Sequence, residues 1–323
     1  MNRSKNRKPH KNHPPDLPLR VTPFPYRGLG SRISVIVKTF NRPQSCTRCI
    51  QCLQSAFPDI HIFIGDDSKI PLNYNNKHVT VVHLPFDSGT SIGRNVILRK
   101  VRTPYFLCID DDMMVSSGTN LPALVELLDT HKDIDGIGGF CSVGEQAKIA
   151  GHISKEGDRL YHTFGQSWGY SKKGLPLYSY ILQIIVGRTA SFKTCEWRAE
   201  LKLSEHSEHF LRAFKQGFKI TFCPLLHVIH QHNYKGERNK PRYAKFRTRG
   251  RMYQDKEANV LKIRYVLNDV FATASEQQRM RNCISHLKKP YLAKKAVLAA
   301  ERMFKTFRKE RGPPKYTITY RKK

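Results

Sequence analysis

The chain of 323 residues is long enough for one large α/β domain with appendages, or for two small domains. Its composition, 39% hydrophobic and 10% aromatic, excludes wholesale disorder and collagen-like or mucin-like chains. The net charge of +30 is uneven, because residues 1–13, 233–251 and 286–323 hold 26 of the 56 basic residues and only three of the 26 acidic ones. These three segments favour polyanions, and the rest of the chain is only mildly basic.

The sequence leads us to expect no membrane anchor and no secretion signal. No run approaches the roughly 18 apolar residues of a spanning helix, and the basic N-terminus lacks an apolar core. We therefore expect a cytoplasmic protein whose eight cysteines are reduced. Residues 1–28 are basic and Pro-rich, which predicts a disordered arm. Cys46, Cys49 and Cys52 have no fourth ligand nearby, so we expect ordinary buried or half-buried thiols rather than a metal cluster.

Apolar, β-branched runs alternate with helical stretches from residue 33 onward. The expected strands are 33–37, 60–65, 79–84 and 105–109, and the expected helices are 44–55 and a second one that is entered at 91–95 and runs to about 101. The run 105–109 is almost wholly apolar, which predicts a strand that is buried on both faces. The alternation predicts an α/β fold with a doubly wound, mostly parallel sheet in a domain of residues 29–254.

Residues 255–323 have a different character. Leu292, Ala296, Ala299, Met303 and Phe307 fall on one helical stripe, and lysines and arginines lie largely off it. The pattern predicts a basic helical extension. We expect it to dock either on the preceding domain or on an anionic membrane surface.

Two acidic clusters end strands of the expected sheet. Asp110, Asp111 and Asp112 directly follow the buried strand, and crowded carboxylates of this kind need a compensating cation. Hard oxygen ligands suit Mn²⁺ or Mg²⁺, and the alternative is an acidic turn that caps a helix. Asp66 and Asp67 end an earlier strand, so they should lie at the same carboxyl edge. There they can accept hydrogen bonds from ribose or a base, or simply form an Asx turn.

Five motifs, taken in order, resemble one family. They are Val-Lys-Thr-Phe-Asn-Arg-Pro (37–43), Asp-Asp-Ser (66–68), Gly-Arg-Asn (93–95), Tyr-Phe-Leu-Cys-Ile-Asp-Asp-Asp (105–112), and Trp197 followed by Glu-His-Ser-Glu-His-Phe (205–210). Together they resemble the GT-A glycosyltransferases, above all the β-1,4-N-acetylgalactosaminyltransferases of the ganglioside GM2 synthase type. The similarity covers roughly residues 31–250. It implies a GT-A, Rossmann-like fold and metal-dependent, inverting transfer of a sugar, expected to be an N-acetylhexosamine, from a UDP-sugar to an acceptor hydroxyl.

The resemblance also implies roles for single residues. The nucleotide-sugar donor would be bound by Thr39, Arg42, Asp66, Asp67, Arg94, Asp110 and Asp111, with Arg94 in a loop before a helix, near the diphosphate or the donor sugar. Asp110 and Asp112 would be the two acids of the DxD motif, and Asp112 would be the direct ligand of a diphosphate-bound Mn²⁺ (or Mg²⁺). The alternatives are surface charges for Arg42 and Arg94 and a helix cap for Thr39.

The chain departs from the family pattern at the general base, because many relatives carry Glu-Asp where this chain has Glu205-His206. The candidates are Glu205, His206 and Glu208, of which we favour Glu205. The alternative for Glu205 is an acid that complements a helix dipole.

The strand expected at 222–232 resembles the one that supplies a histidine to the metal. We favour His230 as this ligand, with His227 and His232 as alternatives, or imidazoles that are merely hydrogen-bonded at a sheet edge. The basic stretch 234–251 resembles a segment that closes over the diphosphate, and the alternative is a solvated loop.

Two other classes of protein are weighed against this one. A sugar-nucleotide pyrophosphorylase should carry a Gly-rich phosphate loop after the first strand, and residues 37–43 contain no glycine. A non-enzymatic polyanion or nucleic-acid binder would suit a pI near 10.0, but the charge lies in tails and one loop rather than in a known binding module, so nucleic acid is not the expected partner. The acceptor, whether a glycan, a glycolipid or a protein, is not specified by the sequence.

Overall fold

The computed structural model describes residues 26–143, 146–148, 150–156, 159–164, 167–181, 184–202, 205–231 and 264–269. The basic stretch 234–251, His232 and the stripe from Leu292 to Phe307 lie outside these residues. The described chain begins inside the expected N-terminal arm. There Tyr26 stacks on Phe57 with ring centroids 6.2 Å apart.

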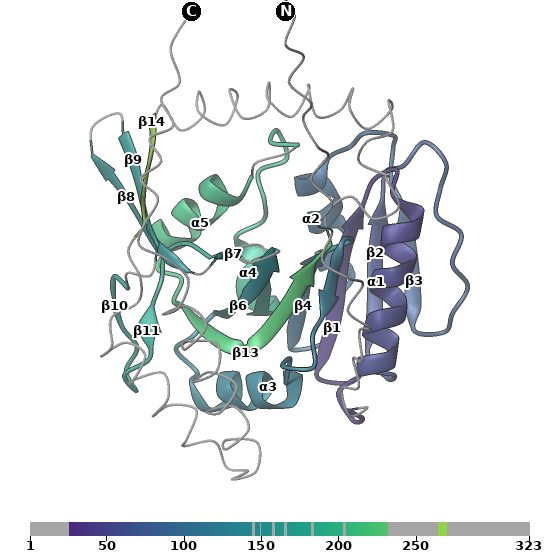
Figure 1. The fold of residues 1–323 in the computed structure, drawn as a ribbon, viewed down its shortest axis with the longest axis horizontal. Helices are drawn as coiled ribbons and strands as arrows, with labels where there is room; N and C mark the ends of the chain where they lie inside the picture. Colours follow the sequence, from purple (N-terminus) through teal and green to yellow (C-terminus); the bar gives the residue numbers. More distant parts are fainter. Residues whose placement is uncertain are drawn as a thin grey trace, which may run out of the picture.

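The helices and strands follow one another in an α/β pattern (Figure 1). In chain order they are β1 (Ile33–Thr39), α1 (Pro43–Ala56), β2 (His61–Asp66), β3 (Val79–His83), α2 (Thr90–Lys100), β4 (Tyr105–Asp110), β5 (Met113–Val115), α3 (Leu121–Thr130), β6 (Gly136–Val143), β7 (Gln146–Lys148), β8 (Gly151–Glu156), β9 (Arg159–Phe164), β10 (Gly169–Tyr170), β11 (Pro176–Leu177), β12 (Ile185–Arg188), α4 (Thr189–Thr194), α5 (His206–Lys215), β13 (Ile220–His230) and β14 (Arg264–Asp269). Every strand and helix expected between residues 33 and 110 is present, with its ends shifted by a few residues.

The large sheet has the order β3-β2-β1-β4-β12-β6-β13-β5. The four strands β1, β2, β3 and β4 pair in parallel. β6 and β13 run in the same direction as these four strands. The expected mostly parallel α/β sheet is therefore confirmed. β12 and β5 run the other way, which the sequence pattern did not predict. β8, β9 and β14 form a separate small sheet, and β10 pairs with β11.

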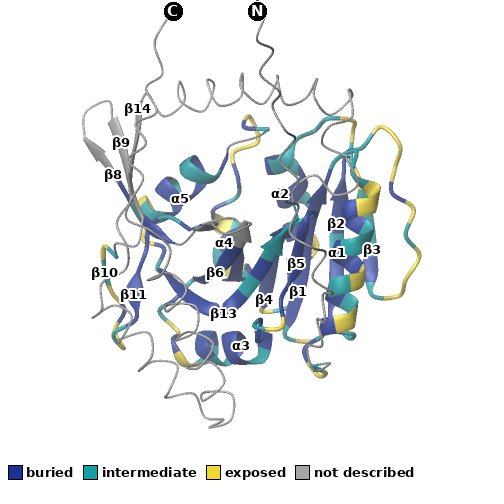
Figure 2. Ribbon diagram, in the orientation of Figure 1, coloured by how far each residue is buried: buried dark blue, intermediate teal, exposed yellow. Residues whose placement is uncertain are grey.

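The core lies between the central strands and the helices that pack on them (Figure 2). All seven residues of β1 and the first five of β4 are buried, as expected for central parallel strands. α1 turns a stripe of Cys46, Cys49, Ile50 and Leu53 inward, at helical spacing. Cys52 is half-buried, so the three thiols are buried or half-buried as expected.

The register of the sheet brings the two acidic clusters together. Thr39 of β1 pairs with Asp66 of β2, and Lys38 pairs with Asp110 of β4. Because these strands are parallel, their carboxyl ends meet at one edge, as the sequence predicted. β13 runs in the same direction, and its last residue, His230, pairs with Met113, so His230 reaches the same edge.

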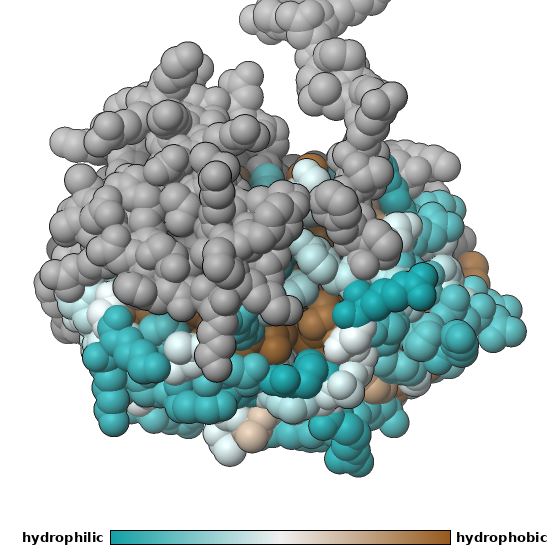
Figure 3. Space-filling model, turned by 90° about the horizontal axis from the view of Figure 1, so that it is seen from below, coloured by the Kyte–Doolittle hydropathy of each residue, from teal (hydrophilic) through white to brown (hydrophobic). Residues whose placement is uncertain are grey.

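The described surface is mostly hydrophilic on the face shown in Figure 3, with a few hydrophobic side chains near its centre. Within the described ranges, no helix is both long and apolar enough to cross a membrane.

Gly187 of β12 gives a direct test of the packing between the sheet and α4. A Cβ added there would lie 2.7 Å from Phe106 Cε1 and 2.9 Å from Phe192 Cδ2, both in buried rings. We predict that Gly187→Ala lowers the free energy of unfolding by about 1–3 kcal/mol, as overpacking does. Urea denaturation measures the change. Gly169→Ala is the control, because nothing lies within 4 Å of an added Cβ there; equal midpoints for the two variants would contradict the packing described.

Candidate functional site

Arg42 bridges two acids of the cluster that follows β4. Its Nη1 donates to Asp112 Oδ2 at 2.6 Å, and its Nη2 pairs with Asp111. Thr39, the last residue of β1, donates from Oγ1 to Asp111 Oδ2 at 2.7 Å. Arg42 is therefore not a surface charge, and Thr39 does not cap a helix with its side chain. Burial raises the pKa of Asp111 well above its usual range, and the charge of Asp112 acts in the same direction against Arg42.

The other oxygen of Asp112 faces His230. His230 Nε2 lies 3.1 Å from Asp112 Oδ1, because β13 ends beside the start of β5. A carboxylate oxygen next to an imidazole nitrogen is a donor pair that suits Mn²⁺. No described group of three His, Cys, Asp or Glu side chains could hold a metal. Mg²⁺ and Mn²⁺ commonly use only one or two protein ligands and take the others from water and substrate phosphates, so Asp112 and His230 are the described residues that could hold such an ion.

His227 is turned away from these acids. Its Nδ1 lies 2.7 Å from Ser116 Oγ, and its ring packs edge-on against Phe140. Burial lowers the pKa of His227 to about 4, so this ring is neutral at physiological pH. Its surroundings are those of a structural histidine, and of the three histidine candidates only His230 is seen beside Asp112 in the described structure.

Arg94 forms a second bridge, between Asp110 and Glu205. The arginine is 1% exposed; its Nη2 donates to Asp110 Oδ1 at 2.7 Å, and its Nη1 pairs with Glu205. Although burial works against the charged form, Glu205 and Asp110 raise the pKa of Arg94 above its ordinary value. A buried arginine with two carboxylate partners is charged under all ordinary conditions.

The position of Arg94 corrects one detail of the sequence interpretation. We expected a loop before a helix, but α2 begins at Thr90, so Arg94 lies in its second turn. The helix can begin this early because its first amides have partners. Thr90 N donates to Lys202 O at 2.9 Å, and Gly89 N donates to Asp67 Oδ2 at 2.7 Å.

The three candidates for the general base are in different surroundings. Glu205, the residue before α5, is 1% exposed and faces Arg94 beside Asp110. His206 Nδ1 lies 3.3 Å from Glu205 Oε1. Glu208 is instead engaged by Arg212 at 2.9 Å and by Arg198 at 3.1 Å. The structure thus brings Glu205 and His206 to the acid cluster, while Glu208 pairs with Arg212 of α5 and with Arg198, which precedes the helix.

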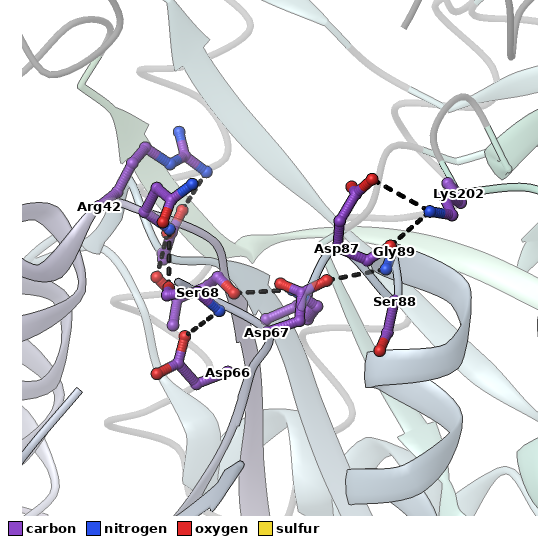
Figure 4. Close-up of polar contacts among 12 residues, drawn as sticks. Arg42, Asp66, Asp67, Ser68, Asp87, Ser88, Gly89 and Lys202 are labelled. Carbon is purple, nitrogen blue, oxygen red and sulfur yellow. Dashed lines mark hydrogen bonds and ion pairs between the residues drawn. The ribbon is translucent and has the colours of Figure 1, made fainter. Parts of the chain in front are cut away.

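Asp66 and Asp67 are both buried but have different partners (Figure 4). Asp66 accepts from Ser68 N at 3.0 Å, an Asx turn, and from Leu72 N at 2.6 Å. Asp67 accepts a hydrogen bond from Gly89 N, which Figure 4 shows, and pairs with the ammonium of Lys38. Of the two, Asp66 shapes its own loop, whereas Asp67 joins β1 to the start of α2.

Sequence reasoning missed three residues at this edge. Lys38 is 7% exposed, and burial lowers its pKa against the pull of Asp67. The sequence feature that could have pointed to Lys38 is a lysine near the end of an otherwise apolar strand. Phe40 and Phe86 form an aromatic pair with centroids 5.8 Å apart, and Phe86 is half exposed. The sequence feature that could have pointed to this pair is an aromatic residue in each of two loops that follow a strand.

Comparison with known proteins identifies the family of the chain. Residues 34–195, half of the chain, match glycosyl transferase family 2. The chain belongs to this family. The membership confirms the resemblance to the GT-A glycosyltransferases and the expected enzyme class, and it sets the chain apart from the sugar-nucleotide pyrophosphorylases.

Several curated relatives are similar to the chain. Mouse β-1,4 N-acetylgalactosaminyltransferase 2 is 28% identical over 67% of this chain and 42% of its own length. Mouse β-1,4 N-acetylgalactosaminyltransferase 1 is 27% identical over 71% of this chain and 45% of its own length. The chain therefore spans less than half the length of these relatives. Among solved structures, S. aureus TarS 1–349 in complex with UDP is similar at 14% identity, with a TM-score of 0.46 over 85% of this chain and 72% of that one.

Behind the acids, His209 of α5 is a buried titratable group. Its ring stacks on Trp197 at 4.5 Å and 14°, and among the described residues neither ring nitrogen has a hydrogen-bond partner. Burial, helped by the nearby charges of Arg212 and Arg94, lowers the pKa of His209 well below its usual value. The folded protein therefore keeps His209 neutral, whereas the unfolded chain protonates this residue below about pH 6.5. Because protonation then favours the unfolded chain, the free energy of unfolding decreases as the pH falls.

We predict that His209→Phe, which keeps a stacked ring, weakens this dependence. The free energy of unfolding should fall less between about pH 7.5 and about pH 5 in the variant than in the wild type. Urea denaturation at both pH values measures the difference. His83→Gln, at a side chain that is 55% exposed, is the control. An unchanged pH dependence in His209→Phe would contradict a neutral, buried His209.

Proposed function

We propose that the chain transfers an N-acetylhexosamine from a UDP-sugar to an acceptor hydroxyl, with inversion and with the help of Mn²⁺ or Mg²⁺. One observation carries the proposal. Arg94 holds Glu205 beside Asp110, while Asp112 lies 3.1 Å from His230 at the same sheet edge. A base and a leaving-group site side by side are what group transfer between two oxygens requires. The similarity to N-acetylgalactosaminyltransferases supports the choice of sugar.

The donor nucleotide is assigned to the β1 and β2 side of the edge. Asp67 and Thr39 supply polar groups for the uridine, and Phe40 with the half-exposed Phe86 offers an aromatic surface for the base. Arg42, whose side chain is 13% exposed, is the cation nearest the acids on this side. It is positioned to meet the diphosphate as well as Asp111 and Asp112.

The metal is assigned to Asp112 and His230, with the diphosphate completing the coordination. When bound, it would neutralise negative charge that develops on the UDP leaving group. Asp110 is engaged by Arg94, so its role in this proposal is to fix the arginine near the diphosphate rather than to serve as the principal ligand.

The acceptor hydroxyl is assigned to Glu205. As its oxygen attacks the anomeric carbon, the bond from that carbon to the UDP oxygen breaks on the opposite face, and the hydroxyl proton passes to the Glu205 carboxylate. Arg94 keeps this carboxylate oriented, and His206, 3.3 Å away, is positioned to receive the proton from it. The acceptor itself is a hydroxyl of a glycan, a glycolipid or a protein.

A panel of nucleotide-sugar donors, read by UDP release with and without Mn²⁺, tests the function as a whole. We expect release from a UDP-N-acetylhexosamine to require the metal and to rise with a suitable acceptor hydroxyl. If no UDP-sugar releases UDP under any metal condition, the proposed function is wrong.

We predict that Asp112→Asn abolishes metal-dependent UDP binding but leaves the fold intact. The substitution removes one ligand of the metal pair and also relieves repulsion among three crowded acids. Calorimetric titration with UDP and Mn²⁺ measures the binding, and thermal unfolding checks the fold. Wild-type affinity in the variant would refute the metal assignment.

We predict that Glu205→Gln lowers transfer by roughly 10²–10⁴-fold, the usual contribution of a general base, with little change in donor affinity. The amide is nearly isosteric and still accepts from Arg94, but it cannot take a proton at neutral pH. His206→Ala and Glu208→Gln are the matched controls. Normal transfer in Glu205→Gln, with collapse in one control, would move the base to that neighbour.

A further inference from the structure

Residues 196–202, here called the strap, run along α2 and lead to Glu205. The side chains of three residues of α2, spaced four residues apart, bind the strap. Ser91 Oγ donates to Leu201 O at 2.5 Å, the Asn95 amide binds Trp197, and Arg99 pairs with Glu196. Side chains at this spacing lie on one face of a helix. One face of α2 thus holds the segment that precedes Glu205.

The Asn95 contact is the only one of the three that uses two hydrogen bonds to the strap backbone. Asn95 Nδ2 donates to Trp197 O at 2.7 Å, and Trp197 N donates to Asn95 Oδ1 at 2.9 Å. Both residues are buried, with exposed fractions of 6% and 4%. Each backbone group would otherwise be buried without its hydrogen bond, which is costly. A side-chain amide donates from one atom and accepts at another, so it suits this position better than a carboxylate, which only accepts.

Trp197 in turn contacts the groups that hold the backbone and the carboxylate of Glu205. Its ring stacks on His209 at 4.5 Å, and His209 N donates to Glu205 O at 3.0 Å in the first turn of α5. The Arg94 guanidinium lies 5.6 Å from the centre of the Trp197 ring, and Arg94 pairs with the Glu205 carboxylate. The indole therefore contacts the helix turn that places the Glu205 backbone and the cation that places its carboxylate.

We propose that Asn95 is a positioning residue for Glu205, acting through Trp197. The inference rests on the proposed function, in which Glu205 is the general base. Arg94 orients the carboxylate directly, and the next residue, Asn95, fixes the ring on which the Arg94 guanidinium and the start of α5 rest. Shortening Asn95 frees the Trp197 backbone and lets this support shift. A displacement of about 1 Å between a base and its hydroxyl is enough to cost about 100-fold in rate.

Arg99 provides a matched control. It binds the same strap from the same face of α2, one turn further on, but its side chain is 62% exposed. An exposed ion pair contributes little to stability. Arg99→Ala should therefore loosen the strap end without moving Trp197.

The experiment uses the full chain with Trp168→Phe, so that Trp197 is the one remaining tryptophan. In this background, Asn95→Ala should lower kcat about 10- to 100-fold, with the donor KM changed less than about twofold. The fluorescence of Trp197 should shift to the red as its ring leaves the buried stack. Arg99→Ala should leave both kcat and the fluorescence of Trp197 unchanged. Asn95→Asp keeps the acceptor for Trp197 N and loses the donor to Trp197 O, so its kcat should lie between those of the wild type and Asn95→Ala. This variant serves as the test if Asn95→Ala does not fold.

The outcomes separate this inference from the proposed function. If Glu205→Gln impairs transfer and Asn95→Ala does not, the positioning role is wrong and the base assignment stands. An equal loss of kcat in Asn95→Ala and Arg99→Ala also overturns the inference, because it would reflect general loosening of the strap. If Glu205→Gln transfers at the wild-type rate, the base assignment is wrong and the positioning role falls with it.

Discussion

Two arginines, the buried Arg94 and the partly buried Arg42, hold four acids at the carboxyl edge of the sheet, and the geometry of the site depends on this pairing. Arg42 joins Asp111 to Asp112, and Arg94 joins Asp110 to Glu205. Acids this close repel one another, and a buried carboxylate without a partner is costly. Removing one partner of a buried pair typically costs about 3–5 kcal/mol, since the other charge is left uncompensated. The arginines are thus part of the fold as well as of the site.

The pairing also connects parts of the chain that lie far apart in sequence. Arg94 belongs to α2, Asp110 ends β4, and Glu205 precedes α5. Each of these elements has its own apolar contacts with the core, so the charges are held by rigid parts of the fold. A second layer, made of Trp197 and the neutral ring of His209, lies behind Arg94. Aromatic packing and charge pairing therefore act on the same few residues, which keeps the acids in place without exposing them fully to water.

The sequence determined the elements and the edge at which the site lies. Apolar runs such as 105–109 are read from local composition, and parallel strands leave their carboxyl ends on one side, so Asp66, Asp67 and Asp110 to Asp112 could be placed together in advance. The ordered motifs also predicted the family. These features depend on local pattern and on a general rule of topology.

Only the tertiary structure decided which side chains meet. The Arg94–Glu205 pair joins residues 111 positions apart, and the amide of Asn95 meets Trp197 across 102 positions. No local pattern encodes such contacts, because they arise when helices pack on a finished sheet. The same holds for Glu208, which lies three residues from Glu205 in sequence but pairs with Arg198 and Arg212. Spacing along the helix made the two acids look alike, and burial against different arginines separated them.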